Sequence, residues 1–437
     1  MRRTLIAVLA AAGCLAAAQA AAASTLVVQG GNTLQFTAAA AETNDVTVSR
    51  SATLFTVTDP GSTITATGPC ASVNPNTATC PVAGVAAVAL SLADRNDQAA
   101  IDASVSLVGV TIQGGDGNDT LTGGENTDDV LSGDSAAAGD DTLNSLGGDD
   151  RLTGGDGNDL LNGGEGSDSL SGDAGLDTIQ GGAGDDTIFS GVLNDEPDVM
   201  GGGAGTDLVD YSGASAGVTV SLDGVANDGV PGEGDNVGVD VEDVTGTAKA
   251  DAITGSAAAN ELLGGAGNDT LSGAGGSDGL DGGRGNDALD GGAGIDAIVG
   301  GPGNDALRGR DISADDVSCG GGADSAVLDA LDVPRACETV SRGVGVATTF
   351  ASVRGRAVTL RLVCPAIEGV RCIGTLTLRS GSARVGGRTF SIDSGTSVDV
   401  RVALTPRGRR ARAVVASNVF RDALGVGVIT RRTVTLR

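Results

Sequence analysis

A nine-residue pattern repeats along the middle of the chain and constrains its fold more than any other feature. The pattern is Gly-Gly-x-Gly-x-Asp-x-U-x, where U is a large aliphatic residue, and its sixth-position Asp recurs at steps of nine. Clear copies are GGDGNDTLT at 114–122, GGDGNDLLN at 154–162, GGEGSDSLS at 163–171, GGAGDDTIF at 181–189, GGAGNDTLS at 264–272, GGRGNDALD at 282–290, GGAGIDAIV at 291–299 and GGPGNDALR at 300–308. A flexible glycine-rich linker would not keep an aliphatic residue in step with each Asp, so we expect a folded region.

The spacing predicts short turns joined by short strands. Six residues of turn followed by three extended residues make half of a coil, so two units form one flattened coil of about 18 residues. The glycines permit the positive φ angles that tight turns require. The single aliphatic residue of each unit points inward, and stacked coils pair through backbone hydrogen bonds. The predicted fold class is therefore all-β, with a parallel solenoid at its centre.

Stacking of the coils also predicts that the aspartates form two columns. Carboxylates separated by one coil spacing, about 4.8 Å, repel each other by roughly 1–4 kcal/mol, depending on the dielectric. A divalent cation between them reverses the sign of this interaction. Calcium takes about six to eight oxygens, from carboxylates and backbone carbonyls, and tolerates irregular geometry. Because glycine-rich turns leave their carbonyls accessible, the repeat predicts a row of calcium sites built from oxygen alone.

These units resemble the calcium-binding nonapeptide of the repeats-in-toxin, or hemolysin-type, proteins. The resemblance implies a right-handed parallel β-roll, in which the sixth-position Asp and turn carbonyls hold several calcium ions between successive coils. Carried onto this chain, it implies the metal ligands Asp119, Asp159, Asp168, Asp177, Asp186, Asp269, Asp278, Asp287, Asp296 and Asp305. Looser copies give the weaker candidates Asp129, Asp141, Asp150, Asp207 and Asp251. Asn260 fills one position of the series, and we expect its unit and that of Asp150 to be structural coils with poor or no metal.

The N-terminus has the form of an export signal. Met1-Arg2-Arg3 is a short positive region, an apolar stretch follows to about Ala18, and small residues offer a cleavage site before residue 24. We therefore expect residues 1–23 to be a signal peptide and the mature protein to be secreted. Lipidation at Cys14 is the alternative. The apolar stretch is short for a membrane span, and no transmembrane segment is expected in the mature chain.

Six cysteines remain beyond that signal, in three sequence-local pairs. The pairs are Cys70 with Cys80, Cys319 with Cys337, and Cys364 with Cys372. An even number of cysteines in an exported chain indicates disulfides, and adjacent pairing is the expectation among the fifteen connectivities that six cysteines allow. The absence of any Cys-x-x-Cys spacing argues against zinc.

Composition excludes several classes of function. The chain has no His and no Trp, and its 56 acidic residues against 27 basic ones give a net charge of −29. Without His there is no Ser-His-Asp triad and no His-based zinc site, so we do not expect an enzyme. The acid excess argues against a nucleic-acid partner, because binding phosphates requires positive charge.

The rest of the chain divides by pattern. Residues 24–112 show short alternating runs typical of strands that lead into the solenoid. The repeat region itself is predicted over 113–310, with an interruption at about 210–245 that we interpret as extra strands or a side loop. Residues 311–340, bracketed by Cys319 and Cys337, are predicted to form a disulfide-bracketed cap, since solenoids need capped ends.

Residues 341–437 differ in both pattern and charge. Alternating runs predict about seven short strands and a basic β-sandwich. Residues 340–437 hold 17 Arg and four acidic residues, a net +13, which leaves −42 for the remainder. The cluster Arg407, Arg409, Arg410 and Arg412 would suit an acidic polymer of the cell envelope. Alternatives are that Arg is simply the surface cation of this chain, which has one Lys, or that the segment contacts an acidic roll.

Together these features predict an exported, calcium-binding structural protein whose repeats fold on extracellular calcium. Its expected location is extracellular, free or associated with the cell surface. The alternative function is a cell-surface adhesin or envelope-polymer-binding protein that uses the basic C-terminal domain. The family implied by the resemblance includes toxins that leave the cell through a C-terminal signal, but the basic tail of this chain does not resemble such a signal.

Overall fold

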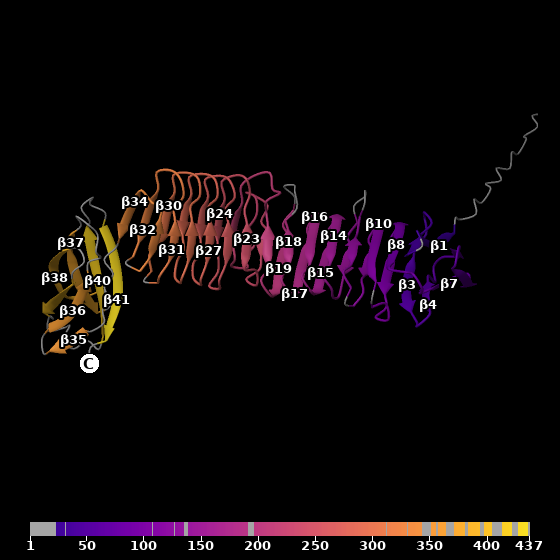
Figure 1. Ribbon diagram of the computed structural model, residues 1–437, viewed down its shortest axis with the longest axis horizontal. Helices are drawn as coiled ribbons and strands as arrows, with labels where there is room; N and C mark the ends of the chain where they lie inside the picture. The colour runs from indigo at the N-terminus through magenta and orange to yellow at the C-terminus, as the bar shows by residue number, and fades with distance from the viewer. Residues whose placement is uncertain are drawn as a thin grey trace, which may run out of the picture.

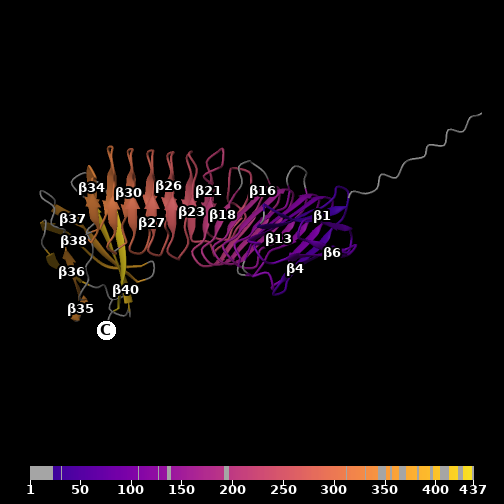
Figure 2. The same ribbon diagram turned by 45° about the vertical axis from the view of Figure 1, so that its right-hand side comes forward.

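The computed structural model consists of strands and turns. It describes residues 23–342, apart from 31, 107, 126, 135–138, 191–195, 312 and 330, and the backbone of seven further strands between 351 and 435. No helix occurs in this part of the chain, so none of it is a helix able to cross a membrane. Most strands stack along one long axis, as Figures 1 and 2 show. The predicted all-β class is confirmed for the described residues.

One long sheet follows the solenoid from its first coil to its last. Within the described residues it has 16 strands, and from β2 onward neighbouring strands run parallel. Its solenoid strands are β8 (Ala87–Asp94), β10 (Gly109–Asp116), β12 (Val130–Ser132), β14 (Arg151–Asp156), β16 (Ser169–Ala174), β18 (Thr187–Phe189), β20 (Leu208–Asp210), β23 (Asp243–Thr245), β25 (Glu261–Leu263), β27 (Gly279–Asp281), β29 (Ala297–Val299), β31 (Asp316–Ser318) and β33 (Val333–Arg335).

The opposite side of the solenoid is divided into two sheets. The first contains β9 (Gln98–Ile101), β11 (Thr120–Thr122), β13 (Thr142–Asn144), β15 (Leu160–Glu165), β17 (Thr178–Ala183), β19 (Val199–Ala204) and β22 (Asn236–Val237). The second contains β21 (Thr219–Ser221), β24 (Ala252–Thr254), β26 (Thr270–Ser272), β28 (Ala288–Asp290), β30 (Ala306–Gly309), β32 (Ser325–Leu328) and β34 (Thr339–Arg342). The predicted interruption at about 210–245 is where one opposite sheet ends and the other begins, while the long sheet continues through β23.

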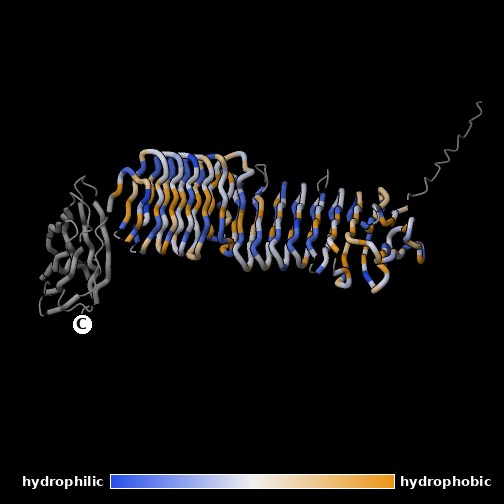
Figure 3. The backbone as a smooth tube through the Cα atoms, in the orientation of Figure 1, coloured by the Kyte–Doolittle hydropathy of each residue, from blue (hydrophilic) through white to orange (hydrophobic). Residues whose placement is uncertain are grey.

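The core is a ladder of single aliphatic side chains. Leu152 pairs in register with Leu170, and Leu161 with Ile179, so residues 18 apart occupy equivalent places in successive coils. These four side chains are at most 1% exposed. Figure 3 shows hydrophobic positions recurring from coil to coil in the same way. The two-unit coil of 18 residues, predicted from the spacing, is therefore present.

Antiparallel strands cover the N-terminal end of the solenoid. They are β1 (Ser24–Gln29), β2 (Thr33–Thr37), β3 (Asp45–Arg50), β4 (Leu54–Thr58), β5 (Ile64–Ala66), β6 (Ala71–Asn74) and β7 (Thr77–Pro81). β2 pairs parallel with β8 and β3 pairs parallel with β9, so this segment extends both sheets of the first coil. The hairpin β3–β4 and the pair β4–β7 are antiparallel. The predicted Cys70–Cys80 disulfide lies in this segment, and its sulfurs are 2.04 Å apart.

The parallel coils extend further toward the C-terminus than the repeat motif suggests. The sequence placed the end of the roll at 310 and a cap at 311–340, but β31 to β34 continue both sheets in register to Arg342. These coils lack most of the motif glycines but keep an acidic residue directly before each strand and, in most cases, the inward apolar residue. The acidic residues are Asp315, Asp324, Asp332 and Glu338. The Cys319–Cys337 disulfide, predicted as the bracket of a cap, joins two of these final coils.

The C-terminal part contains seven described strands in two antiparallel sheets. One sheet has the order β35 (Ala351–Arg354), β36 (Ala357–Val363) and β39 (Ser397–Ala403), and the other has the order β38 (Ala383–Asp393), β37 (Arg371–Ser380), β40 (Ala413–Arg421) and β41 (Gly427–Thr435). Three predictions fall outside the described residues. They are the signal peptide with Cys14, the Cys364–Cys372 disulfide, and the cluster Arg407, Arg409, Arg410 and Arg412.

Candidate metal centre

Every Asp predicted as a ligand is buried at the same place in its coil. Each of them ends a turn directly before a strand, and all fifteen are at most 3% exposed. An isolated buried carboxylate is costly, because burial removes the water that stabilises its charge. A row of buried acids therefore needs either protons or cations to be stable.

One carboxylate oxygen of each Asp joins consecutive coils. The backbone N–H of Asp159 donates to Oδ1 of Asp177 at 2.8 Å, and the N–H of Asp269 donates to Oδ1 of Asp287 at 2.9 Å. The same bond from a backbone N–H to Oδ1 of the next coil repeats along four columns of residues. By residue number, the columns are 97, 119, 141, 159, 177, 198 and 235; 129, 150, 168, 186 and 207; 251, 269, 287, 305 and 324; and 260, 278, 296, 315 and 332. The sequence predicted two columns, and each is broken at the interruption at 210–245. Beside the long sheet, Glu242 follows Asp207 in place of an Asp and accepts the Asp207 N–H at 3.1 Å.

The second carboxylate oxygen has no partner in most of the predicted ligands. Oδ2 is buried and has no hydrogen-bond partner in thirteen of the fifteen. At Gly264, the first position of one unit, an added Cβ would lie 2.7 Å from Oδ2 of Asp269 and 2.8 Å from the carbonyl oxygen of Gly282 in the next coil. A side chain at this position would collide with both oxygens, so the glycine lets a carboxylate oxygen and a carbonyl oxygen lie close together.

Burial and mutual repulsion raise the pKa values of the carboxyls in these columns. The pKa of Asp159 is raised to about 8, chiefly by burial and also by the neighbouring carboxylates of Asp177 and Asp141. Burial likewise raises the pKa of Asp119 and of Asp141 to about 7. These pKa values are close to neutral pH, so a cation that binds the charged carboxylates would strongly favour their ionised form.

The donor set fits a hard divalent cation such as calcium. Positions such as that beside Gly264 offer carboxylate and carbonyl oxygens, which are the ligands that calcium prefers. Among the described residues no group of three or more acidic, Cys or His side chains is placed to hold a metal, so a site here would need backbone carbonyls besides its carboxylates. When bound, the ion would neutralise the charge of the columns.

Two predicted ligands have no such open oxygen. Both oxygens of Asp251 are taken, since Oδ2 accepts the Thr247 N–H at 2.7 Å and the Thr247 hydroxyl donates to Oδ1 at 2.9 Å. In Asp129, Oδ2 accepts the Gly124 N–H at 2.6 Å and Oδ1 accepts the Thr127 hydroxyl at 2.8 Å. Asn260 is closed in the same way by Ser256. These units resemble one another in satisfying the sixth residue from within their own turn.

The other weaker candidates are placed differently. Asp141 and Asp207 keep an unpartnered Oδ2, as the clear copies do. The unit of Asp150 carries Ser145 at its first position, where other units have glycine, and the Ser145 hydroxyl donates to the Gly163 carbonyl at 2.6 Å. The carbonyl equivalent to that of Gly163 lies beside Oδ2 in other units, and in this unit it is already hydrogen-bonded.

Some members of the columns were missed by sequence reasoning. Asp97, Asp315 and Asp324 are buried with an unpartnered Oδ2, and Asp198 accepts the Asp177 N–H at 2.8 Å. Their units lack some or all of the motif glycines. The remaining signal was Asp followed two places later by an apolar residue, as in Asp315 and Val317, which is too common to use alone.

Comparison with known families agrees with this geometry. The model of the RTX calcium-binding nonapeptide repeat matches residues 111–136, 135–170, 162–197, 245–280 and 281–311. No curated protein matches the chain. The unmatched stretch between 197 and 245 contains the sheet interruption. The chain therefore contains RTX calcium-binding nonapeptide repeats, and the matched residues lie in the parallel β-solenoid.

Proposed function

We propose that this protein is an exported structural protein whose solenoid folds when its repeats bind extracellular calcium. The observation that carries the proposal is the row of buried Oδ2 atoms without a hydrogen-bond partner, most of them beside the first glycine of their unit. Calcium supplies the charge that the columns lack, and its binding energy becomes folding energy.

The proposed export step supplies the calcium. Inside a cell calcium is scarce, so the aspartates of each column repel one another and the chain remains loosely folded. Extracellular calcium modules bind with dissociation constants of roughly 0.1–1 mM, and calcium outside cells reaches that range. The disulfides Cys70–Cys80 and Cys319–Cys337 support an oxidising location, where such bonds persist. The signal-like residues 1–23 support the same route.

The proposal assigns no catalysis to the chain. Its sequence has no His, and the buried aspartates that carry raised pKa values are explained by the metal columns. The solenoid is then a scaffold.

Circular dichroism of the mature full-length chain tests the proposal. In EDTA at neutral pH we expect a spectrum with little strand signal from the repeats, and about millimolar calcium should produce the β spectrum cooperatively. Magnesium at the same concentration is the control, because it prefers a tighter octahedral shell. A fully folded spectrum in EDTA that does not change with calcium would refute the proposal.

A second candidate function is binding of an acidic cell-envelope polymer by the C-terminal part. The supporting observation is the net +13 of residues 340–437, against −42 for the rest of the chain. Sedimentation of the protein with isolated envelope polymer, compared with a chain that ends at 342, tests it. Equal binding by the two chains would exclude this role.

A further inference from the structure

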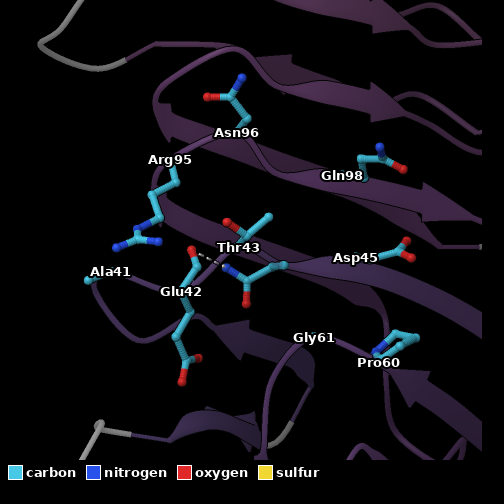
Figure 4. A pocket seen from close by; sticks show the side chains of 10 residues that line it. Ala41, Glu42, Thr43, Asp45, Pro60, Gly61, Arg95, Asn96 and Gln98 are labelled. Atoms are coloured by element: carbon cyan, nitrogen blue, oxygen red, sulfur yellow. Dashed lines mark hydrogen bonds between the residues drawn. The ribbon is translucent and has the colours of Figure 1, made fainter.

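A polar pocket lies at the N-terminal end of the solenoid, outside the residues matched by the repeat family. It is lined by residues 41–45, by Pro60 and Gly61, and by Arg95, Asn96 and Gln98. Figure 4 shows Thr43 between the segment of Arg95 to Gln98 and the turn at Pro60 and Gly61. The pocket therefore brings together the start of β3, the turn after β4 and the turn before β9.

Three buried oxygens in and beside this pocket have no hydrogen-bond partner. They are Oδ1 of Asn44, Oδ2 of Asp59 and Oδ2 of Asp97, and the three residues are at most 1% exposed. Asn44 lines the pocket, Asp59 directly precedes Pro60, and Asp97 lies between two lining residues. Buried polar atoms normally have partners, so three buried acceptor oxygens without a donor indicate a site for a ligand that oxygens bind.

The local bonds hold these groups close together. Oδ1 of Asp97 accepts the Asn44 N–H at 2.7 Å, and Oδ1 of Asp59 accepts the N–H of Asp45 at 3.1 Å and of Gly61 at 3.2 Å. Each carboxylate thus uses one oxygen for the backbone and leaves the other free, as the aspartates of the repeats do. Burial raises the pKa of Asp97 to about 6, and repulsion from Asp59 is a smaller contribution.

Gly61 allows the Thr43 carbonyl to lie close to the turn of Asp59. An added Cβ at Gly61 would lie 2.6 Å from the Thr43 carbonyl oxygen and 3.5 Å from Oδ1 of Asp59. A side chain at residue 61 would collide with this carbonyl, so the glycine lets a backbone oxygen lie near the carboxylate.

We propose that Asp59, Asn44, Asp97 and the Thr43 carbonyl form a divalent-cation site of the calcium type in the N-terminal segment. The donors are oxygens only, with two carboxylates, an amide oxygen and a carbonyl, which suits a hard cation of flexible coordination. A bound ion would join the hairpin β3–β4 to β9, the first strand of its sheet within a complete coil. It would therefore close the open end of the solenoid.

Hydrogen–deuterium exchange of the full-length chain, with and without calcium, tests the site through peptides covering 41–48, 57–63 and 94–100. The key variant is D59N, which keeps an acceptor for the Asp45 and Gly61 N–H groups and removes the free charged oxygen. In EDTA we expect D59N to protect these peptides as well as the parent chain does, because it removes a buried unpaired charge. In calcium the parent should gain protection here, and D59N should lose most of that gain.

Two comparisons separate this site from its surroundings. The variant D102N, which changes an exposed Asp of the same segment, should behave like the parent chain. Peptides from 152–189 and 262–308 report the repeat sites in the same samples, so failure of the proposed function would appear there. Calcium protection of the three N-terminal peptides that is equal in D59N and the parent would overturn the site.

A second variant keeps the test decisive if D59N disturbs the fold. N44D adds a third carboxylate, and since ligand charge tunes calcium affinity, the calcium needed for half-maximal protection should fall by roughly tenfold. An unchanged midpoint in N44D would overturn the site.

Discussion

The hydrogen bonds of a single Asp decide whether a coil has a carboxylate oxygen without a partner. Asp287 and Asp251 occupy the same position two coils apart in one column, and both are buried. Oδ2 of Asp287 has no partner, whereas Thr247 bonds both oxygens of Asp251. The motif position thus places the carboxylate, and the second residue of the turn determines whether its Oδ2 has a hydrogen-bond partner.

Replacing these two aspartates separates metal binding from simple burial. D287N should lower the calcium bound per chain by about one ion, because a neutral amide replaces a ligand oxygen. D251N should leave the calcium content unchanged. Atomic spectrometry of dialysed full-length protein measures the content. Equal losses in the two variants would contradict the distinction between open and closed aspartates.

The raised pKa values predict that the metal-free chain folds better in acid. The folded-state pKa is about 8 for Asp159, about 7 for Asp119 and about 6 for Asp177, chiefly through burial. The pKa of Asp in an unfolded chain is about 3.9. The folded state therefore binds more protons than the unfolded state between about pH 4 and about pH 8. Stability without calcium is therefore greatest at the acid end of this window and falls as the pH rises through it.

Calcium should reverse this dependence, because it binds the deprotonated form. Circular dichroism in EDTA should show more β structure at pH 5 than at pH 8, while the calcium concentration for half-maximal folding should rise as the pH falls from 8 to 5. Folding in EDTA that improves with rising pH would contradict the assignment.

At the scale of the element, a second ladder on the surface joins turns that carry Asn or Asp at the fifth position. The N–H of Asn286 donates to Oδ1 of Asn268 at 2.8 Å, and the N–H of Asn304 donates to Oδ1 of Asn286 at 2.8 Å. In the first half of the solenoid Asp140 and Asp149 accept equivalent bonds at 2.9 Å. Fifth-position side chains accept N–H bonds from the following coil, and sixth-position side chains accept them from the preceding coil. Such a turn is therefore bonded to both of its neighbours.

Loss of this ladder should weaken the stack without removing a metal ligand. N286A deletes the acceptor for Asn304 and should cost about 1 kcal/mol, the usual value of one hydrogen bond with a partner left in water. N286D keeps the acceptor oxygen and should cost less. Urea denaturation in saturating calcium measures both. A loss as large in N286D as in N286A would show that the acceptor is not the cause.

At the scale of the whole molecule, the solenoid is continuous on one side and divided on the other. The long sheet passes the interruption at 210–245 through β23, while β22 ends one opposite sheet and β21 begins the next. Tyr211 is buried at this point and donates to Oδ2 of Asp235 at 3.0 Å. The two halves share one backbone ladder and have separate aspartate columns on the divided side.

The terminal disulfide should stabilise only the last coils. Cys319 and Cys337 join the coils of β31 to β34, where the motif glycines are sparse. Closing a loop of this length is worth about 3 kcal/mol, so C319S/C337S should open these coils. Hydrogen exchange should rise in peptides from 313–342 and stay unchanged in 152–189. A uniform rise along the solenoid would instead indicate one cooperative unit.

The nonapeptide pattern alone predicted much of this protein. A period of nine with glycine turns, one inward aliphatic and one Asp per unit predicts coils of 18 residues, and both Leu152 and Asp168 lie where the period places them. Local repetition suffices because every coil meets only its neighbours, so the same short-range rule applies at each step.

The tertiary structure decided what the pattern leaves open. Thr247 closes Asp251, Ser145 bonds a carbonyl beside Asp150, and the coils continue to Arg342 on units that keep little more than the Asp. The grouping of Asn44, Asp59 and Asp97 depends on a hairpin packed against the first coil. Each of these results depends on which residues from other turns fill the space beside a carboxylate, and a nine-residue period does not specify those contacts.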